Sequence, residues 1–362
     1  MEQNNSFLIL FLAPVREYLE NDDVSEVLIN GPNQVYVESK GKLQLTPAHF
    51  PSEQSLRAAA SNIAKSVGRI LDDNNPRLDA RLPDGSRVHA VIPPLSRCGT
   101  VIAIRKFKKD TLTIDKLRSF GSMSDDAVKL IHALVALHKN VIVSGGTSSG
   151  KTSVLNALSS FIGEDERVLV IEDASELQLQ QRHVVCFETR KADKNGNGEV
   201  TIRDLIHSSL RLRPDRLVIG EIRGGEALDL LQALNTGHAG SMSTIHANTP
   251  LDCLYRMETC ALLSGVEIPL TALRSQVASA IDAVVHTARL ADGSRKLMAI
   301  SEVLPLQNGE YRTSDLLVWQ TDRILRDADD PTKVKVEGHH ALKNAPSFAE
   351  DAKLNGLELP QQ

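Results

Sequence analysis

A glycine-rich stretch near the middle of the chain constrains the fold more than any other feature. It follows an apolar run, 141–143, that is expected to form a buried strand, and it precedes 152–161, which is expected to be helical. Between them the spacing Gly145-x4-Gly150-Lys151-Thr152 matches the phosphate-binding P-loop pattern. Glycines let successive backbone N–H groups turn toward phosphate oxygens, and the following helix N-terminus adds partial positive charge. The strand before the loop and the helix after it favour a nucleotide site over a chance glycine loop.

Each residue type in this loop suits one part of a nucleotide–Mg²⁺ complex. Lys151 is expected to reach the β- and γ-phosphates, and the Thr152 hydroxyl is expected to bind Mg²⁺. The predicted cofactor-binding segment comprises Gly145, Gly146, Thr147, Ser148, Ser149, Gly150, Lys151, Thr152 and Ser153.

Length and composition indicate a soluble globular protein of two domains and a tail. The chain has 362 residues, of which 41% are hydrophobic and 24% charged. A net charge of −5 and an aromatic content of 4% argue against a surface devoted to nucleic acid, so no nucleic-acid partner is expected. The cysteines have no CxxC or zinc spacing, which is typical of reduced thiols in a cytosolic protein.

The pattern of apolar runs and turns divides the chain into four parts. Residues 1–109 predict a small α+β domain, and the polar stretch 110–123 predicts a linker. Strands and helices then alternate over 124–320, which is typical of an α/β domain with a parallel sheet. Residues 321–362, which are charged and contain three prolines, predict a loosely packed C-terminal extension.

Two further apolar strands end in carboxylates. Residues 217–220 lead to Glu221, with Gly220 standing where an aspartate is often found, and residues 168–171 lead to Glu172 and Asp173. Ligands of a parallel sheet lie beyond the carboxyl ends of its strands, so these acids could converge on phosphate bound by Lys151. Such an acid lies beside Mg²⁺ or the attacking water in P-loop enzymes. Helix capping or a solvated turn explains Asp173 equally well.

Two histidines and one polar loop are weaker candidates. His238 and His246 flank the expected strand 242–246 and could hydrogen-bond the γ-phosphate or its neighbours. Zinc is not indicated, because neither a cysteine nor a third histidine lies nearby. The loop 193–204 matches much of a calcium loop, but Asp204 replaces the bidentate glutamate and a strand precedes the loop. A polar β-to-α loop is therefore favoured there.

Several segments in a fixed order carry a family resemblance. They are GGTSSGKT at 145–152, VIEDASELQL at 170–179, LRLRPDRLVIGEIRGGEALD at 210–229 and NTGHAGSMSTIHANTP at 235–250. These segments resemble the Walker A, Asp box, Walker B and His box of the type II/type IV secretion ATPases. The ETR loop at 188–190, GEVTIRDL at 198–205 and RLADGSRK at 289–296 are most similar to the CpaF-like branch, which powers Tad pili.

The resemblance implies a hexameric ring of RecA-like ATPase domains, each preceded by an N-terminal domain that closes over nucleotide. ATP and Mg²⁺ are the implied cofactors, with Lys151 and Thr152 on phosphate and metal. Glu221 is then the Walker B acid and also a metal ligand, and Glu172 is the carboxylate that activates water. His238 and His246 are expected near the γ-phosphate.

The same resemblance extends into the N-terminal domain. The segment DARLPDGSRVHAVIPP, followed by GTVIAIRKF, resembles the arginine clamp of the family and points to Arg81, Arg87 and Arg105 as nucleotide-binding residues. Ser148 departs from the branch, which usually has glycine there, and this change is expected to stiffen the loop.

The function implied is a Mg²⁺-dependent ATPase that drives Tad-type pilus assembly or secretion. It would be cytoplasmic and peripherally associated with the inner membrane, docked on polytopic membrane proteins of the pilus or secretion platform. A conjugation or type IV secretion ATPase is the first alternative. A RecA-like DNA motor and a nucleotide-gated scaffold with negligible hydrolysis are others, disfavoured respectively by the acidic net charge and by the intact Lys151, Glu172 and Glu221.

Overall fold

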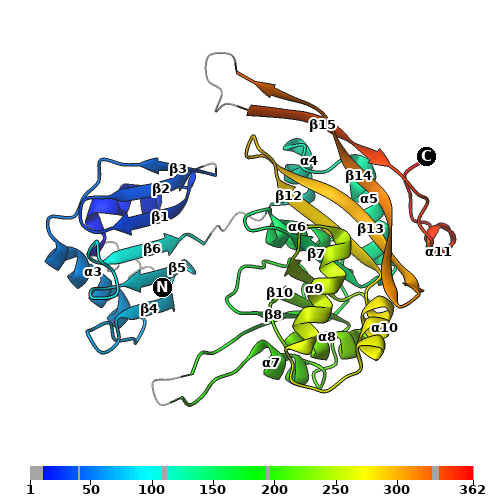
Figure 1. Ribbon diagram of the computed structural model, residues 1–362, viewed down its shortest axis with the longest axis horizontal. Helices are drawn as coiled ribbons and strands as arrows, with labels where there is room; N and C mark the ends of the chain where they lie inside the picture. Colours follow the sequence, from blue (N-terminus) through cyan, green and yellow to red (C-terminus); the bar gives the residue numbers. More distant parts are fainter. Residues whose placement is uncertain (1–10, 40, 108–111, 193–195, 328–333, 362) are drawn as a thin grey trace. The chain divides into compact units, whose positions relative to one another are not determined.

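The structure of the protein is a computed structural model that describes residues 11–39, 41–107, 112–192, 196–327 and 334–361 (Figure 1). The chain divides into two compact units, residues 1–110 and residues 111–362, and each is described by itself. The expected calcium-like loop begins at residues 193–195, which lie outside the described residues.

The N-terminal unit is built on an antiparallel sheet of order β3-β2-β1-β6-β5-β4. Its elements are η1 (Ala13–Val15), α2 (Arg16–Glu20), β1 (Val24–Asn30), β2 (Val35–Ser39), β3 (Lys42–Leu45), α3 (Glu53–Ser66), β4 (Arg77–Arg81), β5 (Arg87–Val91) and β6 (Val101–Arg105).

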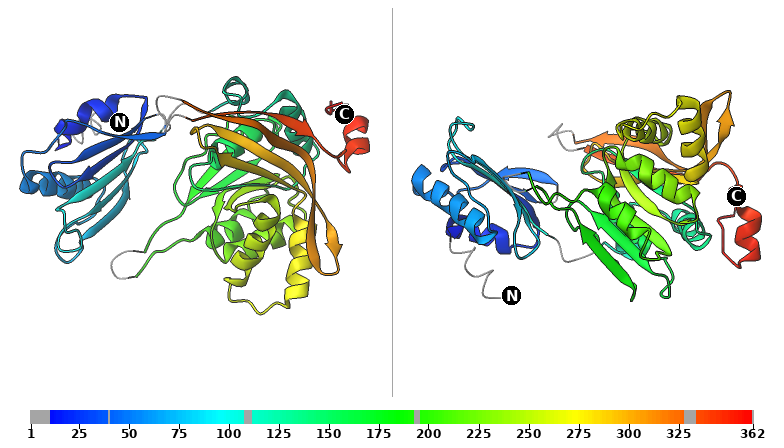
Figure 2. Two further views of the ribbon diagram at one scale, coloured as in Figure 1. Left: turned by 45° about the horizontal axis from the view of Figure 1, so that its top comes forward. Right: turned by 90° about the horizontal axis from the view of Figure 1, so that it is seen from below.

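Alternation along the central strands separates a buried face from a solvated face. On β5, Val88 and Ala90 are buried, while Arg87 and His89 point the other way. Helix α3 lies along the buried face (Figure 2) and contributes Leu56 and Ile63 to the core of this unit. Ser52 and Ser55 begin α3 with a reciprocal capping box, which satisfies backbone N–H groups that the first turn leaves without partners.

The second unit carries the alternating elements that the sequence predicts. They are α4 (Ile114–Ser119), α5 (Asp125–Ala136), β7 (Val141–Gly145), α6 (Lys151–Ser159), β8 (Val168–Glu172), β9 (Val184–Glu188), α7 (Ile202–Ser209), β10 (Arg216–Ile222), α8 (Glu226–Asn235), β11 (Met242–His246), α9 (Pro250–Leu262), α10 (Leu270–Ala280), β12 (Ala283–Arg289), β13 (Arg295–Gln307), β14 (Glu310–Arg326), β15 (Val334–Leu342) and α11 (Ala349–Leu354).

One large mixed sheet runs through this unit in the order β15-β14-β13-β12-β7-β11-β10-β8-β9. The strands from β12 to β9 are parallel, and β13, β14 and β15 extend the sheet in antiparallel fashion. Because the parallel strands share one direction, the ends of β7, β8, β10 and β11 meet at one edge of the sheet. The predicted α/β fold class with a parallel core is confirmed.

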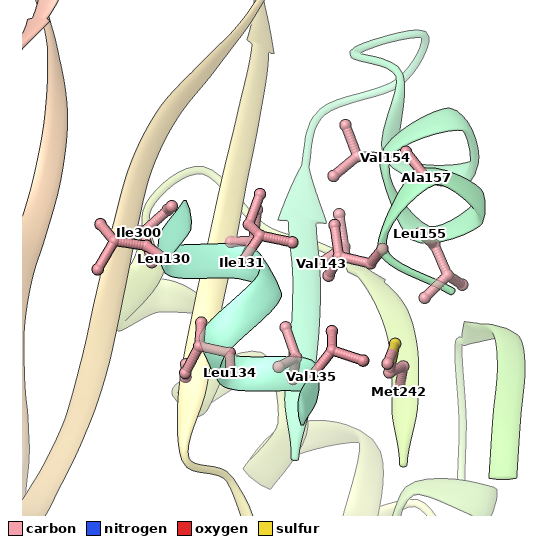
Figure 3. Close-up of a cluster of buried hydrophobic side chains, with 14 of the residues drawn as sticks. Leu130, Ile131, Leu134, Val135, Val143, Val154, Leu155, Ala157, Met242 and Ile300 are labelled. Atoms are coloured by element: carbon pink, nitrogen blue, oxygen red, sulfur yellow. The ribbon is translucent and has the colours of Figure 1, made fainter. Parts of the chain in front are cut away.

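Helices cover both faces of the sheet and bury it. Figure 3 shows α5 and α6 packed on one face, with Ile131 of α5 beside Val143 of β7. Helices α7 to α10 form the other apolar layer, to which α8 contributes Leu230 and α9 contributes Leu254. This three-layer arrangement explains the near-continuous apolar strands, since both faces of the parallel region are buried.

The structure differs from the sequence-based prediction in three segments. The expected linker 110–123 contains α4, whose Leu117 is buried in the core. The expected loose extension 321–362 instead completes β14, adds β15 to the sheet and buries Phe348 and Ala352. Strand β4 was not expected, because only Leu78 of its five residues is buried. Non-local strand pairing and packing create these elements, and local periodicity does not reveal them.

None of the described helices combines the length and the hydropathy that a membrane span requires.

Candidate functional site

The loop between β7 and α6 has the backbone of an anion-binding cradle. Gly145 and Gly150 have positive φ, 155° and 98°, and Gly150 is the N-cap of α6. No side chain caps this helix, so its first N–H groups are directed into the loop. An uncapped helix N-terminus that follows a glycine turn favours a bound anion such as phosphate.

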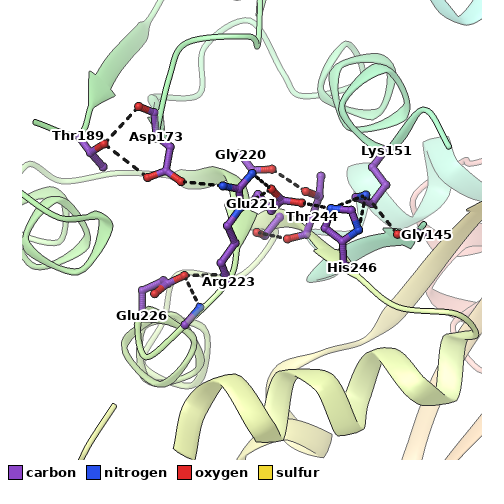
Figure 4. A network of polar contacts seen from close by, with 12 residues as sticks. Gly145, Lys151, Asp173, Thr189, Gly220, Glu221, Arg223, Glu226, Thr244 and His246 are labelled. Atoms are coloured by element: carbon purple, nitrogen blue, oxygen red, sulfur yellow. Dashed lines mark hydrogen bonds and ion pairs between the residues drawn. The ribbon is translucent and has the colours of Figure 1, made fainter. Parts of the chain in front are cut away.

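Lys151 is the charged side chain of this cradle (Figure 4). It is only 8% exposed, and its ammonium donates to the carbonyl oxygens of Gly145 at 3.2 Å and Gly146 at 3.0 Å. Burial lowers the pKa of Lys151, while the negative charge of Glu221 acts in the opposite direction. The cation is thus held at the loop with few water contacts, where an approaching phosphate would interact with it strongly.

Glu221 and His246 lie beside Lys151 at the carboxyl edge of the sheet. His246 ends β11, opposite Gly145 in the strand register, and its ring nitrogens lie 3.3 and 3.4 Å from the Lys151 ammonium. His246 Nε2 is 2.9 Å from Glu221 Oε1, and Arg223 forms an ion pair with the same carboxylate. Burial and the nearby Lys151 lower the pKa of His246. The structure therefore brings together Lys151, Glu221 and His246 as the sequence predicts.

Glu172 occupies a separate buried niche at the end of β8. Its side chain is 3% exposed, and Oε1 accepts hydrogen bonds from the backbone N–H groups of Glu176 at 2.9 Å and Leu177 at 3.0 Å. A Cβ on Gly220 would lie 3.0 Å from Glu172 Cγ. Glycine at position 220, where an aspartate is often found, therefore gives the Glu172 side chain its space. Burial raises the pKa of Glu172 from 4.5 to about 7.

The raised pKa makes a stability prediction for Glu172→Gln. The carboxyl is protonated in the folded state up to about pH 7 but ionises near 4.5 in the unfolded chain, so raising the pH between these values destabilises the wild type. Above pH 8 this effect lowers the free energy of unfolding of the wild type by on the order of 3 kcal/mol. Glutamine keeps an Oε1 acceptor for the two N–H groups and does not ionise. The Tm of the variant minus that of the wild type should therefore rise from pH 5 to pH 8.

Glu164→Gln, at an exposed position in the turn before β8, serves as the control for that measurement. Its Tm difference from the wild type, measured at the same pH values, is the baseline. A difference for Glu172→Gln that varies with pH no more than this baseline would show that Glu172 ionises normally in the folded protein.

Three other candidates lie away from the P-loop. His238 precedes β11 at the opposite end from His246, and its Nδ1 is 3.3 Å from the carbonyl oxygen of Ala233, so the expected γ-phosphate contact is not supported within this chain. Asp173 faces Thr189 and Arg223. Asp204 forms a capping box with Thr201 at the start of α7, which agrees with a polar loop rather than a calcium ligand.

The three candidate arginines of the N-terminal unit form one row across its sheet. Arg81 of β4 is directly opposite Arg87 of β5, which is opposite Arg105 of β6, and Arg105 is opposite Glu26 of β1. They lie on the solvated face, where Arg87 and Arg105 line a hollow of about 180 Å³. Glu26 and Asp79 line the same hollow, so basic and acidic side chains share this face.

The comparison with known families decides the identity. The family described as "Type II/IV secretion system protein" matches residues 11–315, which include both the arginine row and the P-loop site. This chain belongs to the type II/IV secretion system ATPase family.

Relatives and solved structures agree with this assignment. The ATPase is 37% identical over 315 residues to "Putative conjugal transfer protein Rv3659c" of Mycobacterium tuberculosis, covering 85% of this chain and 88% of the relative. It is 29% identical to the type IV secretion system protein VirB11 of Brucella suis, covering 76% and 84%. The Yersinia pseudotuberculosis ATPase DotB has the same fold, with a TM-score of 0.57, 17% identity, and coverage of 85% and 80%.

Sequence reasoning missed the residues that surround the P-loop of this secretion ATPase from β12 and β13. Thr287 Oγ1 lies 3.0 Å from Ser149 Oγ, His286 Nδ1 lies 2.9 Å from Ser144 Oγ, and Arg295 Nε donates to the Ser148 carbonyl at 2.9 Å. In the sequence, the RLADGSRK segment is notable only for its resemblance to the CpaF-like branch. Its role depends on β12 pairing with β7, a contact between distant residues that no local pattern reveals.

Proposed function

We propose that this chain is a Mg²⁺-dependent ATPase that hydrolyses ATP at the P-loop of its second unit. The uncapped N-terminus of α6, with buried Lys151 facing Glu221 and His246, is the observation that carries the proposal. It combines oriented N–H donors and a fixed cation for phosphate with a carboxylate for a metal ion. Hydrolysis of ATP by the purified protein, dependent on added Mg²⁺, is the first test.

The residues present fit a Mg²⁺ ion. Magnesium is usually held by one or two carboxylates together with phosphate oxygens and water, and P-loop enzymes add a Ser or Thr hydroxyl. Thr152, in the first turn of α6, and Glu221, which is 17% exposed, would supply that hydroxyl and carboxylate. The ion would neutralise charge that develops on the phosphates. Lys151 would bind the same phosphates, and His246 would orient Glu221 through their 2.9 Å contact.

Glu172 is the proposed proton acceptor for the attacking water. Its two backbone hydrogen bonds fix Oε1, and a pKa of about 7 lets the carboxylate accept a proton near neutral pH. The Glu221 carboxylate already contacts the guanidinium of Arg223 and the imidazole of His246. These two contacts suit a metal-binding role for Glu221 better than a role in proton transfer.

This division of labour predicts different behaviour for two conservative variants. Glu172→Gln should leave Mg·ATP affinity nearly unchanged and lower kcat by roughly a hundredfold or more, the loss expected for a general base. Glu221→Gln should also shift the Mg²⁺ concentration needed for half-maximal activity upward. Steady-state rates over a Mg²⁺ titration measure both effects. Identical titration curves for the two variants would contradict the separate roles.

The proposed machine is a hexameric ring that powers Tad-type pilus biogenesis at the cytoplasmic face of the inner membrane. Support comes from the ETR loop at 188–190 and the RLADGSRK segment, which resemble the CpaF-like branch. Polytopic inner-membrane proteins of a pilus platform are the expected partners. Affinity capture of the full-length protein from detergent-solubilised membranes, followed by mass spectrometry, tests this directly. Recovery of Tad pilus platform proteins with it is the expected result.

A conjugal transfer or type IV secretion ATPase is the second candidate. It is supported by the names of the mycobacterial and Brucella relatives. Capture of conjugation or type IV secretion channel components in the same experiment would favour it and contradict the pilus role. A RecA-like DNA motor would instead show ATP turnover that DNA stimulates, which the net charge of −5 disfavours.

A further inference from the structure

Ser148 adopts a conformation that an L-amino acid rarely takes. Its φ is +57°, in the left-handed region, and it lies in the loop between Gly146 and Gly150. The left-handed conformation costs a residue with a Cβ roughly 1–2 kcal/mol, a cost that glycine avoids. The phosphate loop therefore needs a contact that stabilises this peptide orientation.

Arg295, the first residue of β13, makes that contact. Its Nε donates a hydrogen bond of 2.9 Å to the carbonyl oxygen of Ser148. Its side chain also lies along the loop, because a Cβ built on Gly150 would be 3.3 Å from Arg295 Cδ. Arg295 thus hydrogen-bonds the loop at Ser148 and leaves little room for a side chain at position 150. A rotation of the Ser148 peptide would remove the carbonyl acceptor and break the hydrogen bond.

The turn that carries Arg295 is itself held in place. Asp292 Oδ1 accepts hydrogen bonds from the N–H of Ser294 at 2.9 Å and from its hydroxyl at 2.6 Å. Asp292 Oδ2 accepts from the N–H of Val336 in β15 at 2.9 Å. The adjoining strand β12 is paired with β7, with Thr287 opposite Gly145. The guanidinium therefore approaches Ser148 from a turn anchored both to β7 and to the C-terminal strand.

We propose that Arg295 is a positioning residue for the phosphate loop, and that it acts by holding Ser148 in the left-handed conformation. The inference rests on the proposed ATPase function for its biological meaning. The Arg295 side chain is expected to order the loop in the nucleotide-free protein as well.

The consequence for nucleotide affinity follows from loop populations. If only a fraction of molecules has the correct loop, the apparent Kd is the intrinsic Kd divided by that fraction. Loss of a hydrogen bond from a charged donor lowers this fraction in a loop that contains serine at the strained position. With glycine at position 148 the left-handed state is no longer strained, so loss of the same hydrogen bond should raise the apparent Kd much less.

The test compares Arg295→Ala in two backgrounds, the natural sequence and Ser148→Gly. Binding of a fluorescent ATP analogue with Mg²⁺ is measured by titration of the full-length protein. Arg295→Ala should raise Kd roughly tenfold in the natural background, and less than about threefold in the glycine background. Arg312→Ala, at an exposed position of β14 in the same sheet, is the matched control and should leave Kd within about twofold.

The two backgrounds distinguish positioning from direct contact. If Arg295 bound the nucleotide itself, its loss would weaken affinity by the same factor with serine or glycine at 148, and that result would overturn the proposal. An unchanged Kd for Arg295→Ala in the natural background would overturn it too.

Hydrogen exchange of the nucleotide-free protein keeps this inference separate from the proposed function. Arg295→Ala should accelerate exchange in a peptide spanning 145–153, whereas Arg312→Ala should not. Unaltered exchange would refute the ordering role whatever the protein binds. Failure of the wild type to bind ATP, or equal binding by Lys151→Ala, would instead count against the proposed function.

Discussion

Replacing Lys151 by alanine is expected to reduce ATP hydrolysis to background, a loss of roughly three orders of magnitude or more. The ammonium lies in a water-poor position between the carbonyls of Gly145 and Gly146 and beside His246. A cation in this position stabilises the negative charge that develops on phosphate far more than a cation in bulk solvent does. Among the described residues, Lys151 is the cationic side chain that donates to the Gly145 and Gly146 carbonyls.

The stability of the variant distinguishes this effect from misfolding. Lys151→Ala removes a buried side chain and two hydrogen bonds, so its Tm is measured beside its turnover, and a folded variant without turnover identifies a loss of catalysis. Lys139→Ala, at the other end of β7 where the ammonium is 3.6 Å from Asp282, is the control and should keep turnover within about twofold. A Lys151→Ala protein with half of wild-type turnover would show that the site is assigned to the wrong loop.

The sequence predicts those elements whose local pattern of apolar residues agrees with their burial in the folded domain. Strands β7, β8 and β10 each contain an apolar run, at 141–143, 168–171 and 217–219, because both of their faces are covered by helices. Two helix starts carry a local signal, since Ser124 and Thr249 are N-caps whose side chains accept hydrogen bonds in the first turn. Strand β14 has no such signal. Its last residues are exposed, and backbone pairing with β13 and β15 holds it in place.

Part of the candidate site could likewise be predicted from the sequence. Residues at the carboxyl ends of parallel strands were expected to meet, and Glu221 and His246 do meet near Lys151. His238 shows that residues close in the sequence need not be close in space. It precedes the five-residue strand β11, whereas His246 ends that strand. At roughly 3.3 Å of rise per residue, the strand alone places the two histidines about 13 Å apart. The contact between Arg295 and Ser148 joins residues 147 positions apart and has no local signature.

Arg87→Ala and Arg105→Ala are expected to lower the rate of ATP hydrolysis by about a thousandfold, since arginines that stabilise a transferred phosphoryl group are worth 10³ or more. The strand register aligns both with Arg81 in one row, and Glu26 is the carboxylate in that row. Glu26 lies 3.9 Å from Arg105, and burial raises the pKa of Glu26 although Arg105 acts to lower it. Glu26 and Asp79 line the same hollow as Arg87 and Arg105.

Arg81 is expected to contribute less than its two neighbours. Its Nε donates to the carbonyl of Gly85 at 3.1 Å, and its guanidinium lies 5.5 Å from the centre of the Phe107 ring. Both contacts shape the turn between β4 and β5. Arg81→Ala should therefore lower the stability of the N-terminal unit as well as the activity.

Removal of Arg87 or Arg105 should affect activity far more than stability. Exposed ion pairs and cross-strand contacts are worth about 0–1 kcal/mol each, so either variant should change Tm little while turnover collapses. Arg77→Ala, on the same face of β4 two rows from Arg81, is the matched control and should keep the wild-type rate within about twofold. Surface ion pairs are worth about 0–1 kcal/mol, so a purely structural row would instead give a small loss of Tm and a near-normal rate. Full turnover by both variants, with the oligomeric state unchanged, would exclude these arginines from the reaction.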